Sequence, residues 1–481
     1  MELTRDHMIE RMLRSDASYN GRFITAVRTT HIYCLPGCTA RKPRPENVEF
    51  YATPDQALAA GYRACKMCRP DDFYHGVDTE ERLAERLAEA IWADPASFRD
   101  VPTMAIAGGV GQTKLFELFR AYYHTTPADM LARARVEAAC RALLGTDATI
   151  IAIAGDVGFE SLSAFQENFR RHTAMSPSAY RQLREGRGFA LALPEGFQAR
   201  QALAYLGRDP HSLTDRVEGD VWASALRLAG GGAALLRVSL GEHVAQCELI
   251  APATLDAEAM RQIHTHVFLG LGLASDPQRF EAMAAGSPEV ARLTEGQRGL
   301  RMPLVADHFD GLVWTIIGQQ INLPFAYALR SRLTELAGQP LVGGRYAPPA
   351  PEAVAALGAG ALSPLSFSRS KAAYLVGVAQ VVAEGRLPLA QLARRSAPAI
   401  ERTLLATRGI GPWSAQYMLM RSFGFADCVP VGDAGLLAAL RTFFSLGERP
   451  DRATTLALME RFAPYRSLAT FHLWRRLGTA G

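Results

Sequence analysis

The sequence predicts a multidomain protein that is mainly α-helical, with two smaller regions of mixed α and β structure. A chain of 481 residues is too long for one hydrophobic core, and ordinary domain sizes predict about three or four units. Apolar residues recur at helical spacing over residues 79–187 and again from 269 to the C-terminus. Runs typical of strands, such as RFITAVRTTHIYC and AALLRVSL, concentrate in the other two stretches. The predicted domains are therefore 1–78, 79–187, 188–268 and 269–481.

The composition is that of an ordinary globular protein, with 48% hydrophobic and 21% charged residues. A formal net charge of +4 permits nucleic-acid binding without arguing for it, because acidic surface elsewhere can mask a basic face. No run approaches the ~18 uninterrupted apolar residues of a membrane helix. The charged N-terminal stretch MELTRDHMIERMLRSD lacks the apolar centre of a signal peptide. We therefore expect a cytoplasmic protein without a membrane partner.

Four of the seven cysteines form two close pairs, Cys34 with Cys38 and Cys65 with Cys68. A disulfide framework is not expected in a reducing compartment. Two close pairs separated by a small folded segment suit one tetrahedral Zn²⁺ with four thiolate ligands, in a small α+β domain. Such a zinc ion is either purely structural or also keeps the sulfurs deprotonated and nucleophilic. The other three cysteines are expected to be small apolar core residues: Cys140, Cys247 and Cys428.

Residues 30–71, including ENVEFYATPDQALAAGYRACKMCRPD, closely resemble the N-terminal domain of the Ada family of adaptive-response proteins. The resemblance implies that Cys34 accepts a methyl group from a phosphotriester in the DNA backbone, with the other three cysteines as its zinc partners. Methylation removes one negative charge from the site, so the methylated form should bind DNA more tightly. Five basic residues near the cysteines are either phosphate contacts or plain solvated surface: Arg41, Lys42, Arg44, Lys66 and Arg69.

Residues 104–131 and 151–184 share one layout, in which a short helix meets a glycine-containing turn and a second helix follows, then proline. Helix-turn-helix units use such a turn to set the second helix into the major groove of DNA. Periodicity alone favours a plain helical bundle. The second copy, however, resembles the signature of AraC-type regulators, with Asp156-Val157-Gly158-Phe159 followed by Phe165, Phe169, Ser176-Pro177 and Tyr180-Arg181. The resemblance implies an all-α DNA-binding domain. The candidate DNA-facing residues of the two units are Gln112, Thr113, Lys114, Glu160, Ser161 and Ser163.

The most specific catalytic signal lies in residues 404–433. Gly409-Ile410-Gly411 allows two helices to meet in a tight hairpin whose N–H groups can grip a DNA phosphate. About twenty residues later, Asp433 precedes an apolar run, where a helix N-terminus would orient its carboxylate. Alone, the glycines indicate only a helix–helix turn and the aspartate only a helix cap. Their combination at this spacing predicts a helix-hairpin-helix site.

From about residue 188 to the C-terminus the chain resembles the AlkA-type 3-methyladenine glycosylases of the helix-hairpin-helix superfamily, including FDGLVWTIIGQQINL and ERFAPYRSLATFHLW. The resemblance implies an α+β subdomain followed by an all-α glycosylase domain. It makes Asp433 the carboxylate that stabilises positive charge on the deoxyribose and helps water attack C1′. Bifunctional relatives carry a lysine nucleophile where this chain has Trp413, so a monofunctional glycosylase is expected. Only Cys428 lies in the C-terminal region, so no iron–sulfur cluster is expected.

Aromatic residues are candidates for the substrate pocket. Trp413 and Tyr417 stand four apart on one helical face, and Trp474 aligns with a pocket tryptophan of the family. Such stripes are more often core than site, but stacking a cationic alkylated purine among aromatics offers about 0.5–2 kcal/mol of selectivity. The resemblance places Gln320 where a side chain fills the gap left by the flipped nucleotide, and Tyr205 as a candidate lid.

These observations predict a monofunctional DNA-3-methyladenine glycosylase II fused to a methyl-sensing zinc module and a regulatory DNA-binding domain. The expected partners are damaged and promoter duplex DNA, with RNA polymerase as a further candidate, and a monomer is favoured. No Pro-Cys-His-Arg motif occurs, so direct reversal of O6-methylguanine is not expected. Three alternatives remain: a transcription factor with a non-catalytic C-terminal half, a glycosylase whose front half only localises it, and a glycosylase for oxidised or mismatched bases.

Overall fold

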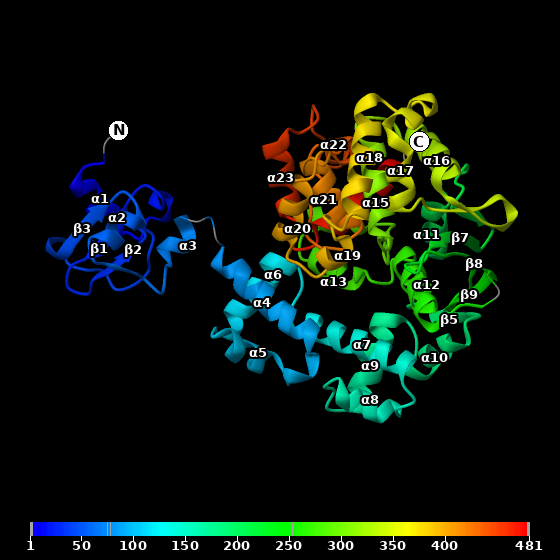
Figure 1. Ribbon diagram of the computed structural model, residues 1–481, viewed down its shortest axis with the longest axis horizontal. Coiled ribbons are helices and arrows are strands. Elements are labelled where there is room, and N and C mark those ends of the chain that lie inside the picture. Colours follow the sequence, from blue (N-terminus) through cyan, green and yellow to red (C-terminus); the bar gives the residue numbers. More distant parts are fainter. Residues whose placement is uncertain (1–2, 75, 77, 253, 479–481) are drawn as a thin grey trace. The chain divides into compact units, whose positions relative to one another are not determined.

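The computed structural model describes residues 3–74, 76, 78–252 and 254–478. The chain forms two compact units, residues 1–86 and 87–481 (Figure 1). The prediction of a mainly helical, multidomain chain is confirmed. Among the helices in the described ranges, none is long and apolar enough to cross a membrane.

The first unit is a four-stranded sheet with short helices around it. The strand order is β3-β1-β2-β4, in which β1 pairs antiparallel with both β3 and β2, while β2 and β4 are parallel. Ile24, Ala26 and Tyr33 fill the core beneath the sheet. Because β2 and β4 are parallel, their C-terminal ends lie side by side. The elements are α1 (Arg5–Leu13), β1 (Ile24–Val27), β2 (Ile32–Cys34), β3 (Val48–Tyr51), α2 (Pro54–Ala59), β4 (Arg63–Ala64) and α3 (Pro70–Tyr74).

Two helix-turn-helix units open the second part of the chain, joined by one long helix, α7. In the first unit Asp100 and Thr103 form a reciprocal capping box that starts α5, and Gly109 ends it in the left-handed conformation at φ 65°. In the second unit Gly158, at φ 96°, makes the turn. The helices are α4 (Thr79–Ala93), α5 (Val101–Gly108), α6 (Gln112–Tyr123), α7 (Pro127–Gly145), α8 (Ile150–Asp156), α9 (Leu162–Thr173) and α10 (Pro177–Arg181).

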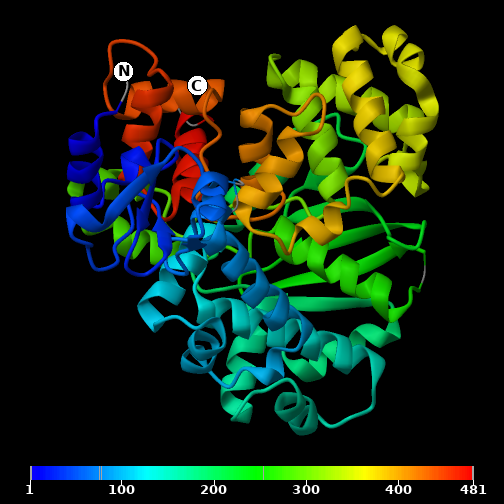
Figure 2. The ribbon, with the colours of Figure 1, turned by 60° about the vertical axis from the view of Figure 1, so that its left-hand side comes forward.

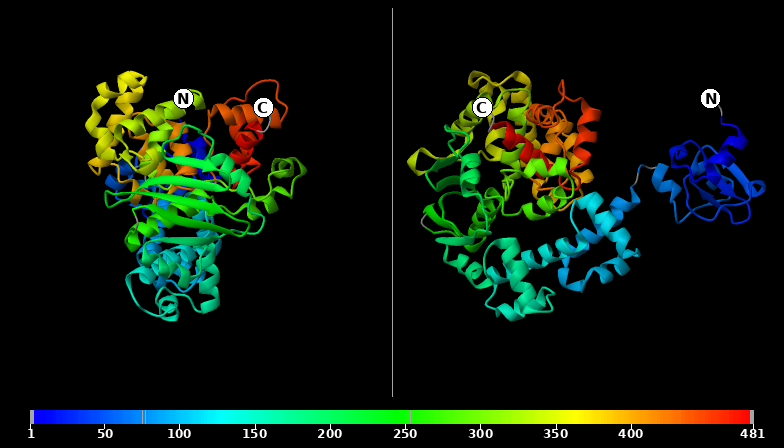
Figure 3. Two further views of the ribbon diagram at one scale, coloured as in Figure 1. Left: turned by 90° about the vertical axis from the view of Figure 1, so that its right-hand side faces the viewer. Right: turned by 180° about the vertical axis from the view of Figure 1, so that it is seen from behind.

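A five-stranded antiparallel sheet follows, in the order β5-β9-β8-β7-β6. Figure 2 shows this sheet between the helix-turn-helix units and the yellow-to-red helices of the C-terminal part, and the left view of Figure 3 shows its strands edge to edge. The pattern of strands in residues 188–268 is therefore confirmed. Its elements are β5 (Gly188–Ala192), α11 (Ala199–Leu206), β6 (Asp215–Glu218), β7 (Val221–Arg227), β8 (Ala233–Leu240), β9 (Val244–Ala251) and α12 (Ala257–Gly270).

The C-terminal part is a helical domain around a single large core that includes Ile316, Leu375, Met418 and Phe471. The proline- and glycine-rich stretch at 337–352 contains a short two-stranded ribbon, β10 (Gln339–Pro340) with β11 (Tyr346–Ala347). The helices are α13 (Pro277–Ala284), α14 (Pro288–Thr294), α15 (His308–Gly318), α16 (Leu323–Ala337), α17 (Pro351–Leu362), α18 (Arg369–Ala383), α19 (Leu389–Leu392), α20 (Ala397–Leu405), α21 (Pro412–Arg421), α22 (Ala434–Phe443), α23 (Arg452–Glu460) and α24 (Arg466–Gly478).

The second helix-turn-helix unit and the five-stranded sheet share one hydrophobic core. Phe165 and Phe169 of α9 belong to the same buried cluster as Trp222 of β7 and Val267 of α12. His264 lies within this core, where its Nε2 is 2.8 Å from the Thr173 carbonyl oxygen. The proposed domain boundary at residue 187 therefore separates two kinds of secondary structure, while the apolar packing continues across it.

Because the second unit contains buried histidines, we expect it to lose stability in acid. Burial lowers the pKa of His264 to about 4 and that of His472 to about 3. An unfolded histidine titrates near 6.5, so the unfolded chain binds more protons between these values, and stability is lost as pH falls below 6.5. Each group should cost about 2 kcal/mol at about pH 5. Urea unfolding followed by tryptophan fluorescence measures this, because all five tryptophans lie in residues 87–481.

In this experiment His264→Gln should reduce the difference in the free energy of unfolding between about pH 7.5 and about pH 5. The matched control, His243→Gln, changes an exposed histidine and should leave the difference as it is. An equal midpoint at both pH values in the unmodified protein would contradict the prediction.

Candidate functional site

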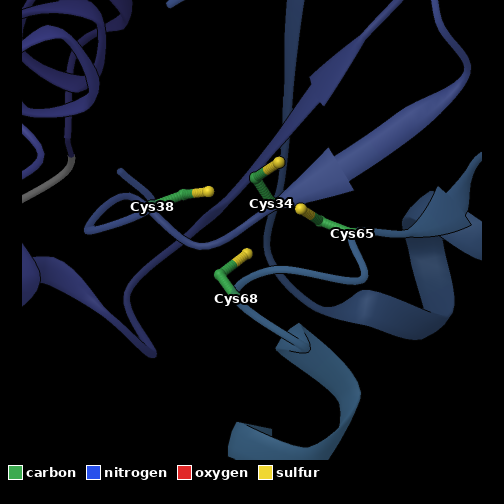
Figure 4. Close-up of side chains that lie close together, drawn as sticks. All are labelled: Cys34, Cys38, Cys65 and Cys68. Carbon is green, nitrogen blue, oxygen red and sulfur yellow. The ribbon is translucent and has the colours of Figure 1, made fainter. Parts of the chain in front are cut away.

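The four paired cysteines meet at one edge of the first sheet. Cys34 is the last residue of β2 and Cys65 directly follows β4, so the parallel pairing of these strands brings them together. The four sulfur atoms lie within 4.8 Å of one another, and Figure 4 shows the side chains of Cys34, Cys38, Cys65 and Cys68 pointing toward one another. Cys34 and Cys68 are partly exposed, whereas Cys38 and Cys65 are buried.

This donor set fits zinc. Four sulfurs around a tetrahedral Zn²⁺ stand about 3.8 Å apart, so the widest pair would need to approach by about 1 Å. The Leu35 N–H donates to the Cys68 sulfur at 3.3 Å, a contact of the kind that orients metal ligands from outside. Hydrogen bonds from Cys34 and Cys68 lower the pKa of the Cys38 thiol to about 2, and the same contact raises the pKa of Cys34. Within the cluster, negative charge is therefore favoured on the Cys38 sulfur, at the expense of the Cys34 sulfur.

The basic residues near the cysteines occupy the surface around them. Lys42 is half-buried and donates to the Cys38 carbonyl oxygen. Arg69 pairs with Asp72 at 3.5 Å. The remaining three are exposed, as phosphate contacts would require: Arg41, Arg44 and Lys66.

In the C-terminal domain, Asp433 is held by three donors. It caps α22, where its Oδ1 accepts from the Leu436 N–H at 2.7 Å. The Trp474 indole N–H donates to Oδ1 at 2.9 Å, and the Trp413 indole N–H donates to Oδ2 at 3.1 Å. The side chain remains partly exposed. Both oxygens are therefore oriented by fixed donors while the carboxylate stays within reach of a substrate.

The predicted aromatic residues form a continuous layer beside this carboxylate. The rings of Trp413 and Tyr417 are 5.3 Å apart between centroids, and those of Tyr417 and Trp474 are 6.1 Å apart. The Trp314 indole N–H donates to the Tyr417 hydroxyl at 3.1 Å and extends the layer, a contact that the sequence did not indicate. The structure thus brings together Asp433 with three of its four predicted aromatic neighbours.

The fourth, Tyr205, packs edge-on against Phe471 at 5.2 Å, with the Arg421 guanidinium 5.0 Å from its ring. Arg421 follows Tyr417 by one turn of α21, which places Tyr205 further along that helix than Trp413. Burial raises the pKa of Tyr205, but Arg208 and Arg421 outweigh it and hold the pKa below its ordinary value. Tyr205 as a lid stays a prediction.

The hairpin before α21 has the expected form. Gly409 adopts φ 97°, and a Cβ there would lie 2.5 Å from the Tyr374 ring, so only glycine fits. Ile410 is buried beneath the turn, and Gly411 begins α21 without a side-chain cap, leaving its first N–H groups open to a phosphate. Gln319 donates to the Gly409 carbonyl oxygen at 2.9 Å, so the exposed Gln320 beside it is fixed relative to the hairpin.

Among the helix-turn-helix candidates, Gln112, Thr113 and Lys114 form the first turn of α6. In the second unit Ser161 caps α9 through its hydroxyl, and the Glu160 carboxylate pairs with Arg99 at 2.8 Å. Ser163 is exposed one residue into α9. Lys114 also pairs with Glu117 at 3.8 Å, so three of the six side chains already have partners within the protein.

Three protein families match the chain in sequence order. The family described as "Metal binding domain of Ada" matches residues 7–71, "Helix-turn-helix domain" matches 104–183, and "HhH-GPD superfamily base excision DNA repair protein" matches 313–464. All three predicted resemblances are confirmed.

Relatives extend these matches over nearly the whole chain. A Mycobacterium tuberculosis protein that carries the name bifunctional transcriptional activator/DNA repair enzyme AlkA is 28% identical over 484 residues, which cover 96% of this chain and 94% of that protein. YfjP of Bacillus subtilis, whose name places it among the DNA-3-methyladenine glycosylases, is 30% identical over 280 residues, which cover 58% of this chain and 94% of YfjP. The chain belongs to the DNA-3-methyladenine glycosylase family.

The family fold is also found among solved structures. A 3-methyladenine DNA-glycosylase from Archaeoglobus fulgidus superposes with a TM-score of 0.53 at 22% identity, covering 60% of this chain and 97% of that one. The fold from the five-stranded sheet to the C-terminus is therefore that of a glycosylase.

Three residues that lie beside predicted site residues of this glycosylase family member were not predicted from the sequence. Phe116 and Arg120 are exposed on α6, one and two turns beyond Gln112, and would continue the stripe that the sequence predicts to face DNA. Extending the helical spacing i, i+4, i+8 from the predicted residues would have found them. Lys371 donates to the carbonyl oxygens at the end of α15, next to Gln320, and no local pattern in the sequence indicates that contact.

The close approach of Gly409 to Tyr374 predicts that Gly409→Ala weakens binding to undamaged duplex DNA by about tenfold, the equivalent of about 1.4 kcal/mol. The added methyl group would displace the hairpin that presents N–H groups to a phosphate. Fluorescence anisotropy with a labelled duplex measures the affinity. Gly385→Ala is the matched control, because Gly385 also has a positive φ, 71°, but nothing lies within 4 Å of its added Cβ. Equal affinities for the two variants would contradict the prediction.

Proposed function

We propose that this chain is a monofunctional DNA-3-methyladenine glycosylase of class II, fused to a methylphosphotriester-sensing zinc module and to a transcription-regulatory DNA-binding domain. The observation that carries the glycosylase activity is the Asp433 carboxylate, oriented by two indole N–H donors beside a layer of aromatic rings. The family membership and the order of the three matched domains support the combination.

In the proposed reaction the damaged nucleotide is flipped out of the duplex and its base lies against the aromatic layer. The bond between C1′ and the base nitrogen breaks, and its electron pair leaves with the base. Positive charge grows on the deoxyribose, and the Asp433 carboxylate stabilises it. Water then bonds to C1′ while its proton passes to the carboxylate.

Selectivity for alkylated purines follows from charge. A 3-methyladenine nucleoside is cationic, and each ring in contact with a cation contributes about 0.5–2 kcal/mol that a neutral base does not receive. Trp413 occupies the position of the lysine of bifunctional relatives, which supports hydrolysis by water over formation of a Schiff base.

In the zinc module, the proposed ligands of one zinc ion are Cys34, Cys38, Cys65 and Cys68. Bound zinc would keep these sulfurs as thiolates. The partly exposed Cys34 is the proposed acceptor: its sulfur bonds to the methyl carbon as the carbon–oxygen bond of the phosphotriester breaks, and the phosphate oxygen leaves as an anion. The loss of one negative charge on sulfur would strengthen binding to DNA.

The two helix-turn-helix units are the proposed readers of promoter DNA. Their second helices, α6 and α9, present exposed polar residues, which is the arrangement that major-groove binding needs. RNA polymerase is a proposed partner of the activated form, and we propose that the chain works as a monomer. The proposed domain bounds remain 1–78, 79–187, 188–268 and 269–481.

Replacing Asp433 tests the glycosylase activity. Asp433→Asn should reduce the release of 3-methyladenine from methylated duplex DNA by at least about 100-fold, because it removes the charge that stabilises the sugar cation. Asparagine is also a good helix cap, so α22 should stay folded. Asp451→Asn is the matched control, since Asp451 caps α23 in the same way and should retain full activity. If the unmodified protein frees no alkylated base, the C-terminal half is a non-catalytic scaffold instead.

Mass spectrometry tests the acceptor. After incubation with a duplex that carries methylphosphotriesters, the peptide containing Cys34 should gain one methyl group, while those containing Cys140 and Cys247 should not, because these thiols are buried. Zinc bound per chain, measured by atomic emission, should be one. Removal of zinc with a chelator should prevent the transfer, because thiolates react and thiols do not. An unmodified Cys34 in the zinc-loaded protein would leave the module a purely structural role.

A further inference from the structure

The segment that delivers Asp433 to the site has no regular structure. It runs from the end of α21 to the start of α22, residues 422–433. Without a helix or strand ladder, each buried backbone N–H in it needs its own acceptor. Two of these acceptors belong to the glycosylase domain: the Cys428 N–H donates to the Ser467 hydroxyl at 3.0 Å, and the Val429 N–H donates to the Gln416 side-chain oxygen at 3.2 Å.

The acceptor for the preceding N–H comes from the first helix-turn-helix unit. The Asp427 N–H donates to Nδ1 of His124 at 3.1 Å, and His124 ends α6, the second helix of that unit. The imidazole also lies edge-on to Phe425, with ring centroids 5.3 Å apart and planes at 83°. Figure 1 shows α6 beside α20, with which it is in contact. One side chain thus reaches from the regulatory domain into the segment that carries the proposed catalytic residue.

The surroundings of His124 fit this acceptor role. Arg466 holds the Asp427 carboxylate with two hydrogen bonds, at 2.7 and 2.6 Å, so Asp427 is fixed on its other side. Burial lowers the pKa of His124 to about 4, with Asp427 opposing and Arg466 adding to the effect. The imidazole is therefore neutral at physiological pH, so its Nδ1 can accept from the Asp427 N–H, with the Cys428 sulfur 4.0 Å from the same nitrogen. His124 also adopts φ 52°, a left-handed conformation that few residues other than glycine and asparagine tolerate.

Further contacts fix the helix-turn-helix units on the glycosylase domain. Asp129 of α7 pairs with Arg279 of α13 at 2.9 Å. Glu137 of α7 pairs with Arg394 at 2.7 Å, and the same guanidinium lies 5.2 Å from the Trp92 ring. With several contacts spread along α7, α6 has a defined position from which His124 meets Asp427.

We propose that His124 is a positioning residue for base excision: the regulatory domain supplies one of three consecutive side-chain acceptors that hold the segment leading to Asp433. This inference rests on the proposed glycosylase function. It also links promoter binding and base excision thermodynamically. A change that shifts α6 alters the support of the segment leading to Asp433, and a change in that segment alters the position of α6 in turn.

Two variants of the full-length protein separate the hydrogen bond from the backbone conformation. His124→Gly keeps the left-handed conformation and removes the acceptor, whereas His124→Asn keeps both, since its side-chain oxygen can replace Nδ1. For release of 3-methyladenine, we expect His124→Gly to lower kcat by about tenfold with little change in KM, as the loss of one buried hydrogen bond predicts, and His124→Asn to restore most of it. Ala174→Gly is the matched control, because Ala174 ends α9 at φ 56°, the equivalent position of the second unit, and should retain full kcat.

Hydrogen–deuterium exchange gives a readout that does not depend on activity. Amides of residues 425–433 should exchange faster in His124→Gly than in the unmodified protein, and His124→Asn should restore their protection. If the unmodified protein releases base but His124→Gly has the same kcat and the same exchange, the inference is overturned. If the unmodified protein releases no base, the glycosylase proposal fails. Even then, unchanged amide exchange in His124→Gly would overturn the inference that His124 supports the segment.

Discussion

Both oxygens of the Asp433 carboxylate accept a hydrogen bond from a tryptophan, and the arrangement of the C-terminal half depends on these contacts. Trp413 lies in the first turn after the hairpin and Trp474 lies near the end of the last helix. The carboxylate therefore joins α21, α22 and α24 at one point, with the hairpin turn that we propose binds DNA only two residues from one of its donors. A shift of the hairpin would move Trp413. The single hydrogen bond from Trp413 would then pass this movement to the Asp433 carboxylate. The proposed binding of the DNA backbone at the hairpin would therefore affect the orientation of the carboxylate.

The regulatory and repair parts of the second unit are joined by packing as well as by chain connectivity. Phe165 and Phe169 of α9 share a core with strands of the five-stranded sheet, so the second helix-turn-helix unit cannot detach without exposing apolar surface. The first unit is held differently, by ion pairs, by the contact of α6 with α20 and by the imidazole of His124. Ion pairs with substantial solvent exposure contribute little stability each. The first unit is thus the part whose position a bound DNA can shift most easily.

How much of this the sequence could predict depends on whether a feature is local. The spacing brings Cys34 close to Cys38 and Cys65 close to Cys68, because residues close in sequence are close in any fold, and two such pairs are typical of a zinc site. That β2 and β4 would pair in parallel does not follow from spacing, since strand pairing is set by the whole core. The contact between His124 and Asp427 spans 303 residues, and it joins two separate motifs, neither of which indicates in its own sequence that it meets the other.

Trp413 and Trp474 each contribute in two ways, through the face of the indole ring and through its N–H group. The indole faces of Trp413 and Trp474, with Tyr417 between them, form the surface against which a cationic base would lie, while their N–H groups point to Asp433. Phenylalanine would keep the face and lose the donor, and histidine would keep a donor with far less apolar area. Only an indole supplies both at this distance, so the same two side chains would couple the proposed recognition of the base to the orientation of the proposed catalytic carboxylate. Discrimination among damaged bases and the rate of bond cleavage are therefore not independent properties of this site.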